Sequence, residues 1–260
     1  MKVAIITGAG GGIGLATTKQ LYDMGMAVVG VGRDLEKLAA LEAEIGDSKR
    51  VATISVDIAA DDAPEKIIKL ALDRFGRIDF LINNAGIGSP KPLHETDDAT
   101  LDHFLGIMLR APFRLARDVI PHMKPGSAII NVTSTYAVVG GRRGGAYSAA
   151  KGGLTALTLH IACDYGPLGI RANCVAPGVT LTDMVKERLN DKMFKRMNVE
   201  MTPYPRLGEA GDIASTIAFL CSPGGEYING QTIVVDGGWS STKYLSPEAL
   251  SAEWVGDSDK

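Results

Sequence analysis

The chain has 260 residues, of which 45% are hydrophobic and 22% charged, as is ordinary for a globular protein. Its net charge of −3 indicates no basic surface for nucleic acid. No apolar run is long enough to cross a membrane, and the N-terminus carries no signal-peptide pattern. The three cysteines have no metal-ligand spacing, so we expect a cytoplasmic protein with no metal, membrane or nucleic-acid partner.

Short apolar runs alternate with longer amphipathic segments along the chain. The runs are rich in Val and Ile, which is typical of strands buried on both faces. Strands are predicted near residues 2–7, 26–31, 51–56, 79–83, 127–133, 170–175 and 231–235. Helices are predicted near residues 13–24, 34–45, 61–75, 98–123, 146–165, 182–200 and 210–221. This alternation predicts an α/β fold, with a single Rossmann-type, doubly wound parallel sheet of about seven strands and helices on both faces.

No linker, repeat or low-complexity run interrupts the alternation. We therefore expect one dinucleotide-binding and catalytic domain over residues 1–240. Residues 241–260 fall outside the pattern and are expected to form a C-terminal tail.

A glycine-rich turn, Thr7 to Gly14, follows the first predicted strand. Gly8 permits a tight turn, Gly12 lets backbone approach a pyrophosphate, and Gly14 lets the next helix pack closely on the sheet. The N-terminus of that helix offers free N–H groups to phosphates. The spacing is G-x-x-x-G-x-G rather than G-x-G-x-x-G, but it opens the first strand–helix unit, as nucleotide binding requires. The predicted cofactor contacts of the turn are Gly8, Gly11, Gly12, Ile13 and Gly14.

The end of the second predicted strand bears on the choice of nucleotide. An acidic residue at this position binds the ribose 2′-hydroxyl of NAD, whereas an arginine accommodates the 2′-phosphate of NADP. Here Gly32 occupies the usual acidic position and Arg33 follows it, while Asp34 is expected to cap the next helix. The pattern favours NADP over NAD, with a solvated surface charge as the alternative reading of Arg33.

Tyr147 and Lys151 stand four residues apart, and Ser134 precedes them. On a helix, residues at this spacing share a face. A phenol ionises near pKa ~10, and a neighbouring cation lowers that pKa. Such a tyrosine can donate or accept a proton, and Ser134 can hold a substrate oxygen beside it. The set predicts acid–base chemistry.

Together with further motifs in order, this pattern resembles the short-chain dehydrogenase/reductase family over residues 2–239. The motifs are Thr7 to Gly14, Asp57-Ile58, Asn83 to Gly86, Ser134, Tyr147, Lys151, Pro177-Gly178 with Thr182, and Val235 to Gly238. The resemblance implies an NAD(P)(H)-dependent oxidoreductase that interconverts a secondary alcohol and a ketone or other carbonyl by hydride transfer. It also implies a homotetramer or homodimer.

The resemblance implies roles for individual residues. Tyr147 would be the general acid in reduction and the base in oxidation. Lys151 would lower the pKa of Tyr147 and hold the nicotinamide ribose, and Ser134 would orient the substrate oxygen. Implied cofactor contacts are Asp57 and Ile58 at the adenine, Asn83, Ala85 and Gly86 at the ribose side, and Pro177, Gly178, Val179 and Thr182 at the nicotinamide. A purely structural hydrogen bond is the alternative for Asn83.

The resemblance places a variable substrate loop at about residues 182–206. Met193, Met197 and Met201 recur there at helical spacing, which indicates either core packing or an adaptable apolar pocket for a hydrophobic alcohol or ketone. Arg142 and Arg143 either are solvated loop charges or attract an anionic substrate. The tail, with Tyr244, Leu250 and Trp254, either covers a neighbouring subunit's active site or is mobile.

Met108 departs from the family pattern. It occupies the place of an asparagine that, in relatives, supports a proton-relaying water near the lysine, and a thioether is at best a weak acceptor. Three consequences stay open: the relay is rebuilt or bypassed, turnover is slow or restricted to unusual substrates, or useful turnover is absent. The last corresponds to a nucleotide-binding regulatory or scaffold protein.

Overall fold

Seven parallel strands form the central sheet of the computed structural model, which describes residues 1–88, 91–247 and 250. Across the sheet their order is β3-β2-β1-β4-β5-β6-β9. The strands are β1 Val3–Thr7, β2 Ala27–Gly32, β3 Val51–Ser55, β4 Phe80–Asn83, β5 Ala128–Val132, β6 Arg171–Pro177 and β9 Thr232–Val235. Both the number of strands and their parallel direction confirm the predicted sheet.

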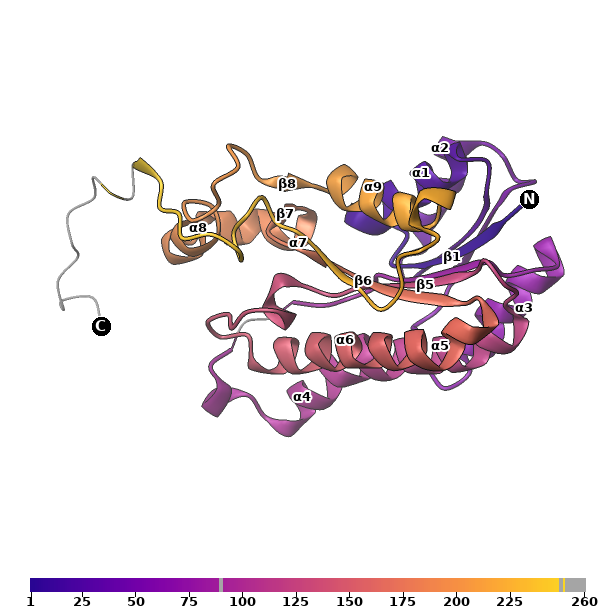
Figure 1. Cartoon of the computed structure of the whole chain (residues 1–260), viewed down its shortest axis with the longest axis horizontal. Coiled ribbons are helices and arrows are strands. Elements are labelled where there is room, and N and C mark those ends of the chain that lie inside the picture. The colour runs from indigo at the N-terminus through magenta and orange to yellow at the C-terminus, as the bar shows by residue number, and fades with distance from the viewer. Residues whose placement is uncertain (89–90, 248–249, 251–260) are drawn as a thin grey trace.

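Helices cover both faces of the sheet (Figure 1). The helices are α1 Gly12–Asp23, α2 Leu35–Ile45, α3 Ala63–Phe75, α4 Asp98–Leu105, α5 Ala111–Val119, α6 Gly145–Tyr165, α7 Asp183–Lys186, α8 Lys192–Asn198 and α9 Ala210–Leu220. Figure 1 shows α1, α2 and α9 on one face and α3, α4, α5 and α6 on the other. The doubly wound arrangement is therefore confirmed.

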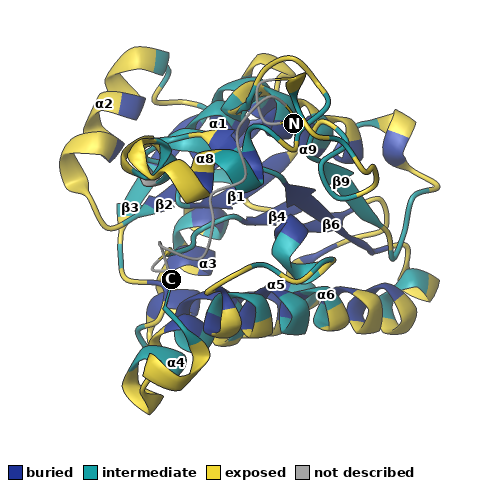
Figure 2. Ribbon diagram, turned by 90° about the vertical axis from the view of Figure 1, so that its left-hand side faces the viewer, coloured by how far each residue is buried: buried dark blue, intermediate teal, exposed yellow. Residues whose placement is uncertain are grey.

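The two layers of helices enclose two hydrophobic cores, and successive residues of one strand serve opposite cores. On β1, Ile5 packs in the core that contains Ile67 and Leu115, whereas Ile6 packs in the core that contains Leu21 and Ile217. This follows from the alternation of side chains along a strand. Figure 2 shows the result: the strands in the middle of the sheet are buried and the helices expose their outer faces. None of the helices in the described part of the chain is long and apolar enough to span a membrane.

The chain reverses its direction of travel across the sheet between β1 and β4. It runs outward from β1 to β2 and β3, then returns to place β4 on the other side of β1. In open parallel sheets, ligands bind in the crevice at the carboxyl ends of the strands beside such a reversal. The strand order therefore locates the candidate site before any side chain is considered.

The helix predicted over residues 98–123 is interrupted, so its continuity was wrongly predicted. It consists of α4, a π-helical turn Gly106–Arg110, α5 and a short 3₁₀ turn, Ile120–His122. Pro112 has no N–H to donate to the carbonyl of Met108, four residues earlier. In the interruption, the Ala111 N–H bonds to the Gly106 carbonyl five residues back, as in a π-helix.

The helix predicted over residues 182–200 is also broken. It consists of α7, a 3₁₀ turn Glu187–Asn190 and α8, and Asp191 caps α8 by accepting hydrogen bonds from Met193 N and Phe194 N. A two-stranded parallel sheet, β7 Thr180–Leu181 with β8 Gly208–Glu209, was not predicted. Strands of two residues carry too little periodicity to be recognised in a sequence.

Candidate active site

The glycine turn after β1 has the backbone geometry that the sequence predicted. Gly8 and Gly12 have φ values of 71° and 50°, which residues with a Cβ rarely adopt. A Cβ on Gly14 would lie 2.1 Å from the Gly8 carbonyl oxygen, so α1 can approach β1 this closely only with glycine there. The turn therefore sets the start of α1 directly beside the end of the strand.

The N-terminus of α1 differs from those of α2, α4 and α8. Asp34, Asp97 and Asp191 each cap one of those helices by accepting backbone hydrogen bonds. In the described structure, α1 starts after Gly11 with no side-chain cap and no acidic residue in its first turn. Its N–H groups are thus available to an anion, which fits the pyrophosphate of a dinucleotide.

A groove of about 1180 Å³, including its open mouth, runs from this turn along the carboxyl ends of the strands. It is lined by most of the predicted cofactor residues: Gly8, Gly11, Gly12, Ile13, Ala85, Gly86, Tyr147, Lys151, Pro177, Gly178 and Thr182. An adjoining pocket is lined by Arg33, Asp57 and Ile58 together with Gly8, Ala85 and Gly86. The two cavities form one continuous path for a long ligand.

Three predicted cofactor residues do not line this path. Gly14 lies beneath the turn, and Val179 lines the neighbouring chamber described below. Asn83 is 3% exposed, and its amide nitrogen donates to Asn131 Oδ1 at 2.8 Å. Asn131 in turn donates to Thr158 Oγ1 at 2.7 Å, so the geometry favours the structural role for Asn83.

Asn84 is a site residue that the sequence reasoning missed. Its backbone N–H donates to Thr7 Oγ1, and its side-chain amide donates to the Thr7 carbonyl, both at 2.9 Å. These bonds join the ends of β1 and β4 at the reversal point, where Asn84 lines the groove. Its position in the run Asn83 to Gly86 was the available signal.

Ser134, Tyr147 and Lys151 lie together at the inner end of the groove. Ser134 follows β5 and starts a 3₁₀ turn, with its Oγ accepting from Tyr136 N at 3.1 Å. Tyr147 and Lys151 lie one turn apart on α6. The Lys151 Nζ is 6.0 Å from the centroid of the Tyr147 ring and donates to the Val132 carbonyl at 2.7 Å.

The pKa of Tyr147 does not follow the sequence expectation. Burial raises this pKa above its usual value, and the neighbouring Ser134 hydroxyl and the charge of Arg188 oppose that effect. Lys151 is not among the groups that lower this pKa, and its ammonium group donates to the Val132 carbonyl. Burial in turn lowers the pKa of Lys151 from 10.5 to about 8.

This lowered pKa of Lys151 predicts a pH-dependent stability difference. Below pH 8 the folded state holds a buried ammonium, which costs free energy relative to the unfolded chain. From pH 8 to 10.5 the folded state loses this proton while the unfolded state keeps it, so stability rises with pH. Relative to Lys151→Met, we expect the free energy of unfolding to gain roughly 3 kcal/mol across this window. Urea titrations at several pH values measure this difference, and parallel curves for the two proteins would contradict the expectation.

A second cavity opens beside Ser134 and Tyr147, and it is called the substrate chamber for the role proposed for it below. It holds about 860 Å³, including its mouth, and shares Ser134 and Tyr147 with the cofactor groove. The rings of Phe104 and Tyr136 meet Tyr147 edge-on, with centroids 6.5 and 6.4 Å away. Its other lining side chains include Lys91, Thr96, Thr100, Arg142, Arg143, Val185, Arg188, Phe194 and Asn198.

The methionines of the predicted substrate loop take neither expected position. Met193 is 51% and Met201 39% exposed, so they do not form a core. Met197 is partly buried, and its carbonyl accepts the Trp239 indole N–H at 2.6 Å. The three residues are not among the described residues that line the chamber. Arg142 and Arg143, by contrast, are exposed and line it.

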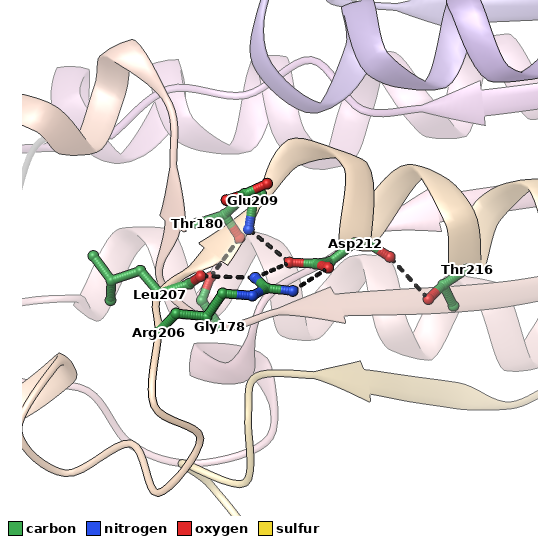
Figure 3. A network of polar contacts seen from close by, with 7 residues as sticks. All are labelled: Gly178, Thr180, Arg206, Leu207, Glu209, Asp212 and Thr216. Carbon is green, nitrogen blue, oxygen red and sulfur yellow. Dashed lines mark hydrogen bonds and ion pairs between the residues drawn. The ribbon is translucent and has the colours of Figure 1, made fainter.

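The base of the substrate loop is held by a polar network (Figure 3). Arg206 binds Asp212 through two hydrogen bonds of 2.7 and 2.8 Å, and Asp212 also accepts from the Glu209 N–H. The Arg206 guanidinium holds the pKa of Asp212 at about 2. This network fixes the loop to the start of α9 and leaves the segment from α7 to α8 to shape the chamber.

Met108 is fully buried in the π-helical turn, near Lys151. A Cβ on Gly86 would contact both the Met108 sulfur, at 3.5 Å, and the Lys151 Nζ, at 3.7 Å. The thioether therefore fills the space beside the buried lysine. Within the described residues, no group of three or more His, Cys, Asp or Glu residues could hold a metal ion. In the tail, Tyr244 is half-buried and Leu250 exposed, while Trp254 lies outside the described residues.

Comparison with known proteins places this geometry in a family. The family model described as enoyl-(acyl carrier protein) reductase matches residues 8–240. The 7α-hydroxysteroid dehydrogenase of Bacteroides fragilis is 36% identical, over 91% of this chain and 93% of its own. A short-chain dehydrogenase/reductase of Brucella melitensis described as glucose/ribitol dehydrogenase is 38% identical, with a TM-score of 0.87 and coverage of 92% and 96%.

A 3-ketoacyl-(acyl-carrier-protein) reductase from the same organism, solved with NADH, is 33% identical, with a TM-score of 0.85 and coverage of 92% and 98%. These relatives are oxidoreductases and lend no support to the alternative of a scaffold protein. They support the reading of the chain as an enzyme that interconverts an alcohol and a carbonyl with a nicotinamide cofactor. The chain belongs to the short-chain dehydrogenase/reductase family.

Proposed function

We propose that Tyr147 transfers the proton in the reaction of this nicotinamide-dependent oxidoreductase, which interconverts a secondary alcohol and a ketone. The observation that carries this assignment is the position of Tyr147. It lines both the cofactor groove and the substrate chamber, Ser134 lines both cavities with it, and it lies one helical turn from Lys151.

The residues present fit a dinucleotide. The uncapped start of α1 would hold the pyrophosphate, and the pocket at Asp57 and Ile58 would hold the adenine. When bound, the nicotinamide supplies or accepts the hydride. Lys151, which lines the groove, would contact the adjoining ribose.

In reduction, the Ser134 hydroxyl donates a hydrogen bond to the carbonyl oxygen of the substrate, and Tyr147 donates its phenolic proton to the same oxygen. Tyr147 is left as a phenolate, which the positive charge of Arg188 stabilises. In oxidation, the phenolate takes the proton of the alcohol. The raised pKa of Tyr147 favours its neutral, proton-donating form before reduction.

A screen of ketones and alcohols tests this function. Steroid ketones, cyclic ketones and 3-oxoacyl thioesters cover the chemistry named for the relatives, and the absorbance of the reduced cofactor reports turnover. We expect turnover with at least one class, in both directions. Cofactor binding without turnover across the panel would contradict the proposal.

We also propose NADP as the preferred cofactor. Arg33 is exposed at the edge of the adenine pocket, and no ion pair engages it within the described residues. Asp34 caps α2, because its Oδ1 accepts from Glu36 N and Lys37 N at 3.0 and 3.1 Å. The expected N-cap at Asp34 is thus confirmed, and Arg33 is left to face a 2′-phosphate.

Arg33→Gln tests this preference. We expect the variant to bind NADPH about 10-fold more weakly, because it loses a charge-assisted hydrogen bond to the 2′-phosphate. Binding of NADH serves as the internal control and is expected to stay unchanged. Calorimetric titration of both cofactors measures the effect, and equal losses for NADPH and NADH would show that Arg33 does not read the phosphate.

We propose further that the protein is a cytoplasmic homotetramer or homodimer. Phe113 on α5 and Leu159 on α6 are 49% and 53% exposed, on helices that cover one face of the sheet. These exposed apolar side chains would be covered if the helices paired between subunits. The three cysteines are free, as in a reducing compartment. Light scattering of the purified protein measures the oligomeric state.

A further inference from the structure

The charged side chains that line the substrate chamber are all positive. Four cationic side chains line it: Lys91, Arg142, Arg143 and Arg188. Among the described residues that line it, there is no Asp or Glu. The chain as a whole carries a net charge of −3, so this concentration of positive charge does not reflect the overall composition. A cleft lined by one sign of charge attracts ligands of the opposite sign.

Arg188 is the cation best placed to contact a substrate. It is partly buried, and its guanidinium carbon lies 4.2 Å from the centroid of the Phe194 ring, which fixes its position against a buried side chain. Its charge lowers the pKa of Tyr147, so it acts within electrostatic reach of the phenol. No ion pair or side-chain hydrogen bond occupies its donors within the described part of the chain.

Two of the other cations are brought to one rim by an unusual loop. Arg143 has a φ of 61°, the one non-glycine residue with positive φ in the described structure. Its carbonyl accepts from Lys91 N at 3.0 Å, and Lys91 pairs with Gly144 in an isolated bridge. A left-handed conformation at a non-glycine residue costs free energy, and here it accompanies the placement of two cations at the mouth of the chamber.

We propose that the natural substrate carries a carboxylate, which Arg188 binds while Tyr147 acts on the alcohol or ketone at the other end of the molecule. A planar guanidinium matches a carboxylate with two parallel hydrogen bonds, and one free arginine near the phenol suffices for this. The rings of Phe104 and Tyr136 contact the hydrocarbon between the two groups. Arg142, Arg143 and Lys91 attract the anion to the mouth. The proposal rests on the function proposed above and specifies its substrate class.

A series of oxo acids tests the proposal. The ligands are 4-oxopentanoate, 5-oxohexanoate and 6-oxoheptanoate, each compared with its methyl ester, so that charge and spacing vary separately. In the full-length protein with NADPH, we expect kcat/KM for the best acid to exceed that for its ester on the order of 10- to 100-fold. Arg188→Gln is expected to reduce this preference by weakening the acid far more than its ester, since the effect of Arg188 on the pKa of Tyr147 acts on both ligands alike. Arg188→Lys is expected to restore it in part.

Arg196→Gln is the matched control. Arg196 lies on α8 in the same segment, does not line the chamber and pairs with Glu200 at 3.7 Å. The Arg196→Gln substitution removes the same positive charge as Arg188→Gln, so a general electrostatic effect would appear in both variants. Equal kcat/KM values for acids and esters in the wild-type protein, or equal losses in Arg188→Gln and Arg196→Gln, would overturn the proposal.

Binding separates this proposal from the proposed function. Tyr147→Phe with NADP is titrated with each acid and ester and followed by NMR, which does not depend on turnover. Selective binding of acids that is lost with Arg188→Gln supports the anion site even in a protein that shows no turnover. Turnover of neutral ketones without any selectivity for acids supports the proposed function and overturns the anion site.

Discussion

Tyr147→Phe is expected to lower kcat roughly 1,000-fold, because the substrate oxygen loses its proton donor. The ring should keep its place, since Phe104 and Tyr136 meet it edge-on and neither contact uses the hydroxyl. The cofactor should still bind, because the phosphate site proposed for it is the glycine turn rather than Tyr147. Steady-state rates with the best ketone from the screen, together with a cofactor titration, measure both effects.

Tyr165→Phe is the control for this substitution. Tyr165 ends the same helix, α6, and packs against the core away from the groove and the chamber. The Tyr165→Phe variant loses the same kind of hydroxyl group, and we expect it to retain full activity. If Tyr147→Phe kept turnover within a few-fold of the wild type, another group would have to supply the proton. The assignment of Tyr147 would then be wrong.

Gly14→Ala is expected to be the most damaging small substitution at the cofactor turn. The new Cβ would lie 2.1 Å from the Gly8 carbonyl oxygen and 2.7 Å from the Asn84 amide nitrogen. The nearer atom belongs to the backbone, so relief requires α1 to move away from β1 rather than a side chain to rotate. We expect a loss of about 3 kcal/mol in the free energy of unfolding, at the upper end for overpacking, measured by urea denaturation.

Gly11→Ala gives the matched comparison three residues earlier. No described atom lies within 4 Å of the position its Cβ would take, and its φ of −171° is extended backbone. We expect its stability to stay within about 0.5 kcal/mol of the wild type. Its Cβ points into space that a pyrophosphate would use, so cofactor affinity should fall. Equal unfolding midpoints for Gly11→Ala and Gly14→Ala would argue against the explanation that close packing of α1 on β1 requires glycine at position 14.

The elements that the sequence predicted well are those specified by neighbouring residues. Runs of Val and Ile specified the strands, since strands buried on both faces need apolar residues throughout. Asp34 specified the start of α2 because an N-cap acts on the two or three residues that follow it. In the same way, Tyr147 and Lys151 are on one helix because their spacing matches a helical turn.

Contacts between distant segments of the chain could not be predicted from the sequence. The i, i+4 spacing of Tyr147 and Lys151 could not reveal that the ammonium group bonds to Val132 on another element. Nor could it show that burial governs the pKa of both side chains. Pro112 is visible in the sequence, but the π-helical turn it accompanies depends on how α4 and α5 pack beside the catalytic helix.

By itself the sequence determined the parallel sheet, the glycine turn and the placement of Tyr147 and Lys151 on one helix, because each is encoded in a short pattern of neighbouring positions. Only the tertiary structure decided the charge of the substrate chamber. Lys91, Arg143 and Arg188 come from three separate loops, and no spacing in the chain relates them. Side chains meet in such a cavity through the packing of whole elements, which local sequence patterns do not record.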